Sequence, residues 1–291
     1  MPDEHSSSTA SITSHQQCCR RVLVLGCGYV GSALAKRLAG EGCDVVATTT
    51  TSSRVSEIAG LGVVPAVLSL DDADKLHDTL ADRDCVCFCV AAGRSRQSYL
   101  ELYANGARRL VDACSGTAVR RILYTSSTRV YAQDDGSMVD EDSPTEPPDE
   151  DGQALVQAER TLLDARNGGL HSDTSVSVLR LGGIHGPGRE LAARIHLAAG
   201  AMRTDGDAYV NLIHLNDIVE AMIRLMGMNH HGVINVCDGR PTLRRELYDR
   251  EIASAGLAAI RWSSSGGQPR GKRVSTDRLR QLLGMTPQPA D

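Results

Sequence analysis

The stretch that decides the fold is RVLVLGCGYVG, residues 21–31. Its first five residues are mostly apolar and predict a short buried strand, and residues 32–39 repeat apolar side chains at helical spacing. Gly26, Gly28 and Gly31 lie between them at GxGxxG spacing. A strand, a glycine-rich turn and a helix in this order open a βαβ unit. We therefore expect a parallel sheet that begins at residue 21.

The chain continues to alternate strand-like and helical segments as far as residue 181. One of these, DCVCFCVA at 84–91, is apolar throughout, which is typical of a parallel strand covered on both faces. The alternation predicts an α/β fold with a doubly wound, Rossmann-type parallel sheet. Further strands are expected at 43–47, 62–68, 121–125 and 175–181, and helices at 71–81, 99–114 and 153–166.

The glycine loop also predicts a ligand. Glycines in this context let backbone amides approach a pyrophosphate, and the helix N-terminus adds partial positive charge. A merely tight turn is the alternative. We expect a dinucleotide to bind in contact with a set of residues at the ends of the first, second and fourth strands. These are Gly26, Gly28, Tyr29, Val30, Gly31, Thr49, Arg54, Ala91 and Ala92.

The end of the second strand bears on which dinucleotide binds. NAD sites usually place an acidic residue there, about 20 residues after the glycines, to bind the ribose 2′-hydroxyl. Residues 47–54 read ATTTTSSR and contain no acid. Hydroxyl groups with Arg54 suit a 2′-phosphate, so NADP is favoured over NAD. Arg54 as a solvated loop residue is the alternative.

Beyond residue 181 the alternation loosens. Residues 182–189 (GGIHGPGR) predict a turn-rich loop, followed by helices at 216–226, 242–255 and 276–283 and a strand at 232–236. We expect three parts: a disordered polar tail at 1–19, a dinucleotide-binding domain at 20–181 and a small, mainly substrate-binding C-terminal lobe at 182–291. Some elements of the lobe should return to the first domain.

Composition excludes several classes of protein. The 291 residues carry a net charge of −5, which argues against a nucleic-acid partner, and no apolar run approaches the roughly 20 residues of a membrane span. The N-terminus has no signal-peptide core, so a cytoplasmic location is expected. Nine cysteines without CxxC spacing predict reduced, buried thiols and no metal site. Cys27 inside the glycine loop is read as a small filler rather than a redox group.

Several further motifs give the chain a family resemblance. From about residue 20 to 284 it resembles the atypical branch of the extended short-chain dehydrogenase/reductases, in the NAD-dependent epimerase/dehydratase group. Besides the glycine loop, the matching segments are VAAG at 90–93, YTSSTRVYA at 124–132, VDEDSPTEP at 139–147, LRLGGIHGPGR at 179–189, IHLNDIVEA at 213–221, NVCDGRPT at 235–242 and KRVSTDRL at 272–279. The resemblance implies a small-molecule substrate under the C-terminal lobe. It also implies a possible homodimer through the helices near 99–114 and 153–166.

The chain departs from this family where the chemistry is done. The resemblance implies a catalytic Tyr and Lys four residues apart on one helix face, but the matching positions hold Asp151 and Leu155. Tyr103 stands where the family has an Asn, and Ser69 where it often has an Asp.

A serine of the family's site is retained. Ser127 matches the family's Ser, which binds the substrate oxygen, although a strand cap is an alternative role for it. A serine needs a base to give up its proton at neutral pH. The candidates are Asp151, Tyr131, His185 and His214, and His185 is preferred because histidine titrates nearest neutrality. Ser127 and His185 are thus the predicted catalytic residues.

Two functions remain open. The first is an NAD(P)-dependent oxidoreductase or epimerase/dehydratase-like enzyme acting on a small hydroxylated substrate. The second is a dinucleotide-binding sensor or scaffold without hydride chemistry.

Residues 134–151 hold nine acids and no base, which predicts a solvated loop with Glu141 and Asp142 at the lip of the pocket. Such a loop would repel a diphosphate, which disfavours a nucleotide-sugar epimerase. Arg180 and Arg189 could hold substrate anions, or Arg180 could only tie loops together.

Overall fold

The computed structural model describes residues 19–92, 99–263 and 268–290. Residues 1–18 of the predicted tail lie outside this range, but Cys19 at its end is buried against the sheet and so is not part of a disordered tail.

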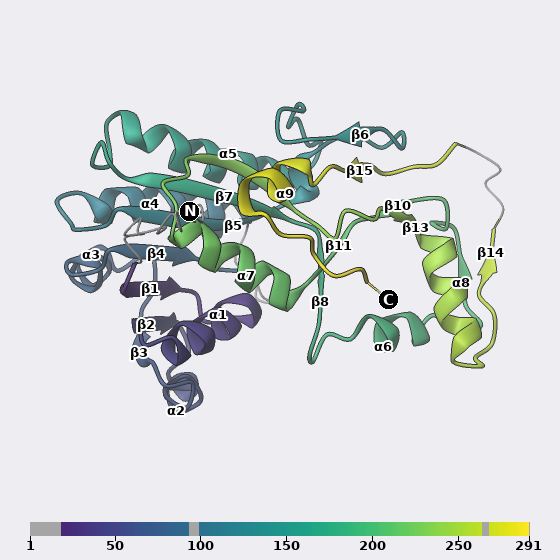
Figure 1. Ribbon diagram of the computed structural model, residues 1–291, viewed down its shortest axis with the longest axis horizontal. Helices are drawn as coiled ribbons and strands as arrows, with labels where there is room; N and C mark the ends of the chain where they lie inside the picture. Colours follow the sequence, from purple (N-terminus) through teal and green to yellow (C-terminus); the bar gives the residue numbers. More distant parts are fainter. Residues whose placement is uncertain (1–18, 93–98, 264–267, 291) are drawn as a thin grey trace, which may run out of the picture.

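Seven parallel strands form the central sheet, in the order β12-β7-β5-β4-β1-β2-β3 (Figure 1). Because β1 and β4 are neighbours, the strand order reverses direction between them, and the carboxyl ends of these strands flank the place where ligands bind in open α/β sheets. The strands are β1 (Arg21–Leu25), β2 (Asp44–Thr49), β3 (Val64–Val67), β4 (Cys85–Phe88), β5 (Arg121–Ser127), β7 (Ser175–Leu181) and β12 (Gly232–Val236).

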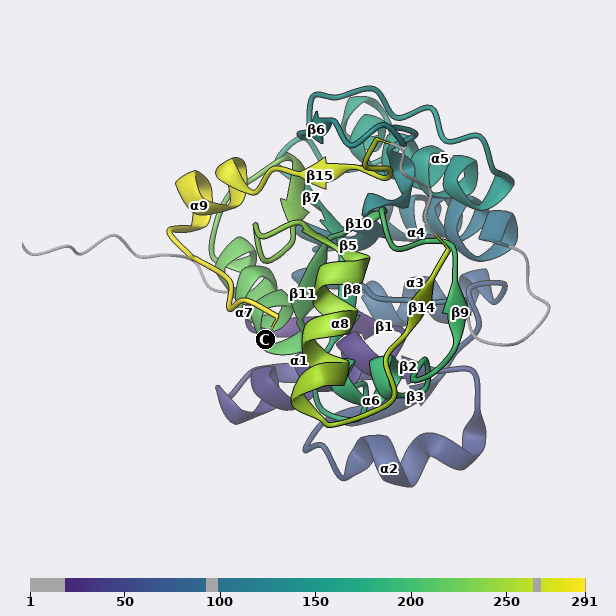
Figure 2. The same ribbon diagram turned by 90° about the vertical axis from the view of Figure 1, so that its right-hand side faces the viewer.

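Helices cover both faces of this sheet, and each face has its own apolar core (Figure 2). One core joins the sheet to α1 (Tyr29–Gly40), α2 (Val55–Ala59), α7 (Leu215–Met226) and α9 (Asp277–Leu283). The other joins it to α3 (Ala73–Leu80), the π-helical turn η2 (Leu100–Asn105), α4 (Gly106–Cys114) and α5 (Glu150–Asp164). The doubly wound, Rossmann-type fold is thus confirmed.

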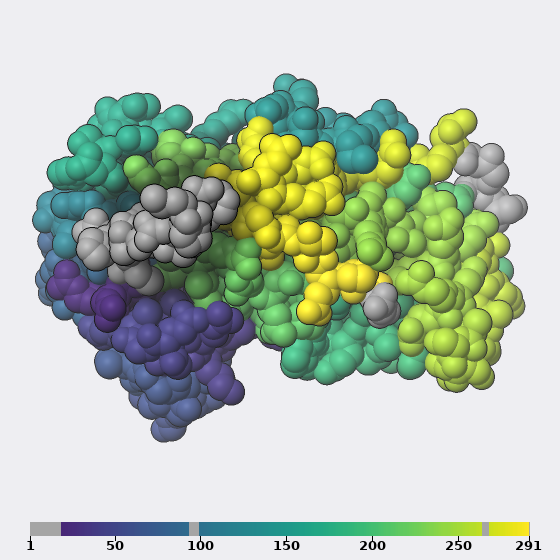
Figure 3. All heavy atoms as spheres, in the orientation of Figure 1, coloured from purple at the N-terminus to yellow at the C-terminus, as the bar shows by residue number. Residues whose placement is uncertain are grey.

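The C-terminal lobe is small and has a separate core. Ile195, Leu247 and Ile252 are buried there between α6 (Leu191–His196) and α8 (Arg244–Ser254). In Figure 3 the surface is notched between the purple N-terminal helices and the green part of this lobe. Its short strands are β8 (Gly183–His185), β9 (Met202–Arg203), β10 (Tyr209–Val210), β11 (Leu212–His214), β13 (Thr242–Leu243) and β14 (Arg261–Trp262).

Some predicted boundaries were wrong. Residues 183–185 were expected in a loop, but they pair with β11 as β8. The acidic segment 134–151 is not one open loop: β6 (Met138–Val139) pairs with β15 (Arg273–Val274), and α5 begins at Glu150. Neither α2 nor α6 was predicted. Both helices are short, with five and six residues, so their apolar periodicity is weak.

Nowhere in the described ranges is there a helix with the length and apolar character that crossing a membrane requires.

Candidate functional site

The glycine loop has the geometry that its sequence predicts. Gly26 has φ +97°, and a Cβ there would lie 2.8 Å from Val90 Cα. A Cβ on Gly31 would lie 2.2 Å from the Gly26 carbonyl oxygen. Both glycines are therefore required by the fold itself. Gly28 differs, since a Cβ there would meet no protein atom within 4 Å. It borders open space at the N-terminus of α1, where backbone amides lack partners within the helix, so this loop fits a pyrophosphate.

The loop after β2 is bonded to the glycine loop. Thr48 Oγ1 accepts a hydrogen bond from the Gly26 amide at 2.9 Å, and Arg54 Nη1 donates to the Cys27 carbonyl at 2.8 Å. The same guanidinium makes two bonds to Glu57, at 2.7 and 3.0 Å. Thr49 is buried and accepts from the Thr51 amide. Arg54 therefore lies at the predicted cofactor loop, with its charge partly balanced by Glu57.

A cleft of about 170 Å³ leads from this loop along the carboxyl ends of β4 and β5. Arg189 lies over the Tyr29 ring, 4.1 Å from its centroid, and the Tyr29 hydroxyl donates to the Pro187 carbonyl. We call this space the cofactor cleft. It is lined by Tyr29, Val30, Cys89, Val90, Ala91, Tyr103, Thr125, Ser126, Ser127, Leu181, Gly182, Ile184 and Arg189.

A larger cleft, of about 470 Å³, lies between the sheet and the C-terminal lobe. We call it the outer cleft. Ser127 lines both clefts. Of the side chains from the described chain that line the outer cleft, Arg129, Arg194, Arg244 and Lys272 are cationic and none is acidic. This contrasts with the net charge of −5 for the whole chain. Lys272 was not predicted as a site residue, although it is the only lysine after Lys75.

Ser127 ends β5, opposite Leu181 of β7. Its Oγ accepts a hydrogen bond from the Arg129 amide at 3.2 Å, so the hydroxyl does cap the turn that follows the strand. The hydroxyl proton remains available, because a hydroxyl can accept and donate at once. Strand capping and substrate binding are thus compatible roles for this residue.

His185 lies elsewhere. It is 9% exposed, and its ring centroid is 5.2 Å from that of His214, the residue opposite it in β11. Its Nε2 is buried without a hydrogen-bond partner among the described residues. Burial lowers the pKa of His185 and the nearby His214 lowers it further, so the neutral ring is favoured. His185 is not among the described residues that line the cofactor cleft or the outer cleft.

The other candidate bases are held in ion pairs or bonds. Asp151, in the first turn of α5, lies 3.2 Å from Arg129. Tyr131 is buried, donates to Asn235 at 2.7 Å and has a pKa raised to about 12 by burial. His214 Nδ1 accepts from the Asn216 amide at 3.2 Å. Leu155, which was predicted to occupy the position of the family's Lys, is 3% exposed and packs in the core beside α4.

The acidic segment differs from its predicted role. Glu141 is buried rather than solvated: its carboxylate accepts from the Asn235 amide at 2.8 Å, and burial raises its pKa. Several of the remaining acids pair with arginines, for instance Asp142 with Arg278 at 2.7 Å. Within the described chain these carboxylates do not line the outer cleft, and Asp149 and Asp151 pair there with Arg129, which weakens the argument against a diphosphate.

Arg180 is fully engaged inside the protein. Its guanidinium bonds Glu159 through two nitrogens and donates to the Tyr131 hydroxyl at 2.9 Å. It therefore ties elements together, which was the alternative to holding a substrate anion.

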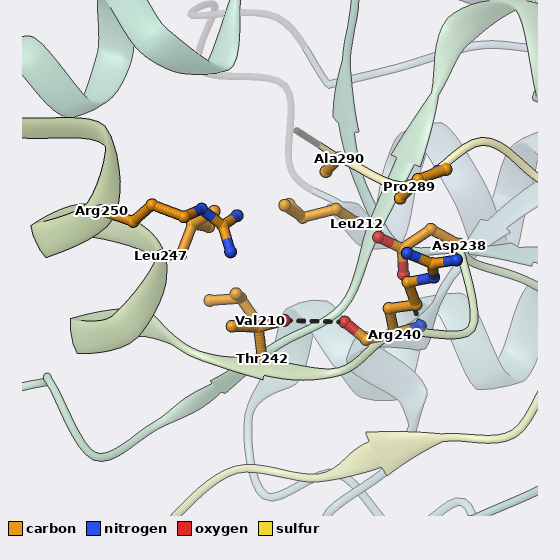
Figure 4. Close-up of a pocket in the computed structure, with 9 residues that line it drawn as sticks. All are labelled: Val210, Leu212, Asp238, Arg240, Thr242, Leu247, Arg250, Pro289 and Ala290. Carbon is orange, nitrogen blue, oxygen red and sulfur yellow. Dashed lines mark hydrogen bonds between the residues drawn. The ribbon is translucent and has the colours of Figure 1, made fainter. Parts of the chain in front are cut away.

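A smaller pocket of about 80 Å³ lies between α8 and the C-terminal segment (Figure 4). Asp238 and Arg240 line one side of it, and Arg250 extends from α8 on the other. The Asp238 carboxylate accepts from the Arg240 amide at 3.0 Å. In the described parts of the chain this pocket shares no lining residue with the cofactor cleft, but it shares Val210, Leu212 and Leu247 with the outer cleft.

Comparison with known proteins finds relatives over most of the chain. The model of the NAD dependent epimerase/dehydratase family matches residues 22–237. Protein YeeZ of Escherichia coli (strain K12) is 30% identical over 271 residues, which cover 91% of this chain and 94% of that protein. The UDP-glucose 4-epimerase of Streptomyces lividans is 25% identical over 301 residues, covering 91% of each chain.

Solved structures share the whole fold. The structure of MoeE5 in complex with UDP-glucuronic acid and NAD superimposes with a TM-score of 0.73 at 25% identity, over 92% of this chain and 94% of that one.

Proposed function

Because the chain belongs to the NAD dependent epimerase/dehydratase family, and is an oxidoreductase- or epimerase-like enzyme, we propose that it oxidises or epimerises a small hydroxylated substrate with a nicotinamide dinucleotide. The observation that carries this proposal is that one cleft is lined both by Tyr29 and Val30, which directly follow Gly28, and by Ser127. A glycine loop with room for a pyrophosphate leads into the cofactor cleft, and Ser127 connects that cleft to the outer cleft.

Each part of this path has a proposed role. The glycine loop and the start of α1 bind the pyrophosphate, and Tyr29, Val30 and Ala91 border the cofactor cleft. Ala92 follows Ala91, and its amide donates to the hydroxyl of Tyr103, which lines the cleft. When bound there, the dinucleotide supplies a hydride acceptor or donor. Ser127 binds the substrate oxygen from the edge of both clefts. The predicted homodimer would form through the outer surfaces of α4 and α5.

We propose NADP rather than NAD as the preferred cofactor. The support is the absence of an acid at residues 47–54 and the place of Arg54 against the glycine loop. The family name and the NAD bound to MoeE5 argue for NAD in those proteins. The ion pair with Glu57 also reduces the charge that Arg54 can offer a phosphate. A cytoplasmic location stays a prediction from the sequence.

The chain is predicted to differ from the family in the acid–base partner of Ser127. His185 stays a proposal, but from outside both clefts it would act on Ser127 only through another group. The second candidate function, a dinucleotide sensor or scaffold, is favoured by Asp151 and Leu155 at the positions of the Tyr and Lys pair. An enzyme is favoured by a 470 Å³ cleft next to Ser127, which is within the usual size of small-molecule sites.

The test is a fluorescence titration of the protein with NADPH and NADH, followed by assays of oxidised cofactor with acidic and neutral hydroxylated compounds. Saturable dinucleotide binding with turnover supports the enzyme, and binding without any turnover supports the sensor. A folded protein that binds neither dinucleotide contradicts both.

A further inference from the structure

Lys272 has an unusual position in the wall of the outer cleft. It precedes β15, is half-buried, and its ammonium donates to the Tyr131 carbonyl at 2.5 Å. The carbonyl of Tyr131 follows directly on the turn that Ser127 caps, so the lysine reaches the wall that Ser127 belongs to. A segment more than 140 residues away in sequence thus brings the lysine to the proposed substrate site.

Within the described ranges this ammonium forms no direct ion pair. In the described ranges no carboxylate lies within 4.0 Å of Lys272, whereas Arg129 pairs with Asp149 and Arg244 pairs with Asp205. An ammonium has three N–H donors, and among the described residues the bond to Tyr131 is the one that uses a donor. A half-buried cation without an anionic partner is costly unless an anion binds it.

The lysine is also held in place. The Gly271 amide donates to Asp134 at 2.8 Å, and the Lys272 carbonyl accepts from Asn211 at 2.8 Å. Pairing of β15 with β6 fixes the next residue. Because the backbone is bound on both sides, little ordering would be needed when a ligand binds.

The electrostatic surroundings of Lys272 agree with its lack of a direct anionic partner. Burial lowers the pKa of Lys272, Asp134 and Asp149 raise it, and Arg129 lowers it to a smaller extent. These two carboxylates therefore compensate the ammonium only in part.

We infer that Lys272 selects the substrate of the outer cleft, by binding an oxyanion, either a carboxylate or a phosphate, with the two N–H groups that Tyr131 leaves available. Of the other cations that line the cleft, Arg194 has no carboxylate partner in the described chain and lies on α6, across the opening. The inference rests on the proposed function only in taking the outer cleft as the substrate site. It concerns the class of substrate and does not depend on which dinucleotide binds.

Lys272 can be observed directly by NMR, because the chain contains only three lysines and their signals can be told apart. These are Lys36, Lys75 and Lys272. Labelling with [ε-¹³C]lysine leaves all three N–H groups in place and gives each lysine its own NMR signal, assigned with K36R, K75R and K272R. The folded full chain is titrated with inorganic pyrophosphate and with malonate, as phosphate and carboxylate probes, at constant ionic strength. Calorimetry of the same protein measures the affinity for these probes.

We expect the Lys272 signal to shift saturably with at least one probe and its pKa to rise when the probe is bound. The exposed Lys36 and Lys75 should not respond. K272M should weaken the probe's affinity about tenfold or more, as expected for loss of a charge-assisted bond, while K272R and the control K36M keep most of it. A response to pyrophosphate alone would identify the oxyanion of the substrate as a phosphate. A response to malonate alone would identify it as a carboxylate.

Two results would overturn the inference: a Lys272 signal that moves no more than those of Lys36 and Lys75, or K272M binding both probes as tightly as the wild type. The NMR result stands on the wild-type fold even if K272M is unstable. An NADPH titration of the same samples separates the two proposals. Lost dinucleotide binding with an intact Lys272 response counts against the proposed function alone.

Discussion

Arg54 and Cys27 are joined across 27 residues by a hydrogen bond of 2.8 Å from the guanidinium to the carbonyl oxygen. This bond fixes the loop after β2 against the glycine loop, and so places a cation at the edge of the proposed dinucleotide site. Glu57 holds two other nitrogens of the same guanidinium. The balance between these contacts decides how well the site accepts a 2′-phosphate.

Replacing Arg54 should therefore change cofactor preference. R54A is expected to weaken NADPH binding by about 1–3 kcal/mol, the range of a hydrogen bond to a charged group, and NADH binding much less. E57Q is the matched variant, since it frees the guanidinium and should tighten NADPH. Fluorescence titration of both cofactors measures the effect. Equal losses of NADPH and NADH in R54A would mean that Arg54 only supports the loop.

The open space at Gly28 allows a test that spares the fold. A Cβ at this position meets no protein atom within 4 Å, so G28V should unfold at nearly the wild-type temperature. The branched side chain would occupy the space proposed for the pyrophosphate and weaken dinucleotide binding at least tenfold, about 1.4 kcal/mol. Gly40, at the other end of α1, is equally unobstructed, and G40V is the control. Wild-type affinity in folded G28V would show that the loop is not the cofactor site.

The predicted replacement of the family's Tyr and Lys by Asp151 and Leu155 should limit turnover. Acid–base assistance is commonly worth about 10²–10⁴ in rate, so the wild type should turn over UDP-glucose poorly in an epimerase assay. D151Y with L155K restores the pair, and a gain in rate would show that the scaffold supports the reaction. Because Leu155 is buried in an apolar core, L155K alone is the control for stability. Efficient epimerisation by the wild type that survives S127A and H185A would contradict this account of the site.

His185 should make stability depend on pH. Its pKa is lowered from the ordinary value of 6.5, so the unfolded chain binds more protons there than the native protein. The stability that the neutral ring contributes is present above about pH 6.5 and is lost as the pH falls through the native pKa. Urea unfolding measured at several pH values should therefore show that the free energy of unfolding falls less steeply at acidic pH for H185Q than for the wild type. Parallel curves would contradict this role.

The residues that make the sheet were predictable, because parallel strands buried on both faces are locally apolar. The strand 84–91 was recognised in this way, and β4 is buried throughout. The glycine loop was predictable for a similar reason, since Gly26 and Gly31 serve the turn itself. Both features depend on residues that are neighbours in sequence.

The candidate site depends on contacts between distant segments, which the sequence does not reveal. Glu141 was expected in solvent because acids surround it, yet its partner is the Asn235 amide, 94 residues away. Lys272 begins a segment that matched the family, but it was not predicted as a site residue because the pairing of β6 with β15, which accompanies its place at the outer cleft, joins distant parts of the chain.

The central claim is that a nicotinamide dinucleotide runs from the glycine loop to Ser127. A crystal structure of the protein with oxidised NADP tests it most directly. The account predicts the pyrophosphate over Gly28, the 2′-phosphate within hydrogen-bond reach of Arg54 and the nicotinamide ring beside Ser127, facing the outer cleft. A dinucleotide bound elsewhere, or with its nicotinamide outside the cofactor cleft and away from Ser127, would contradict it.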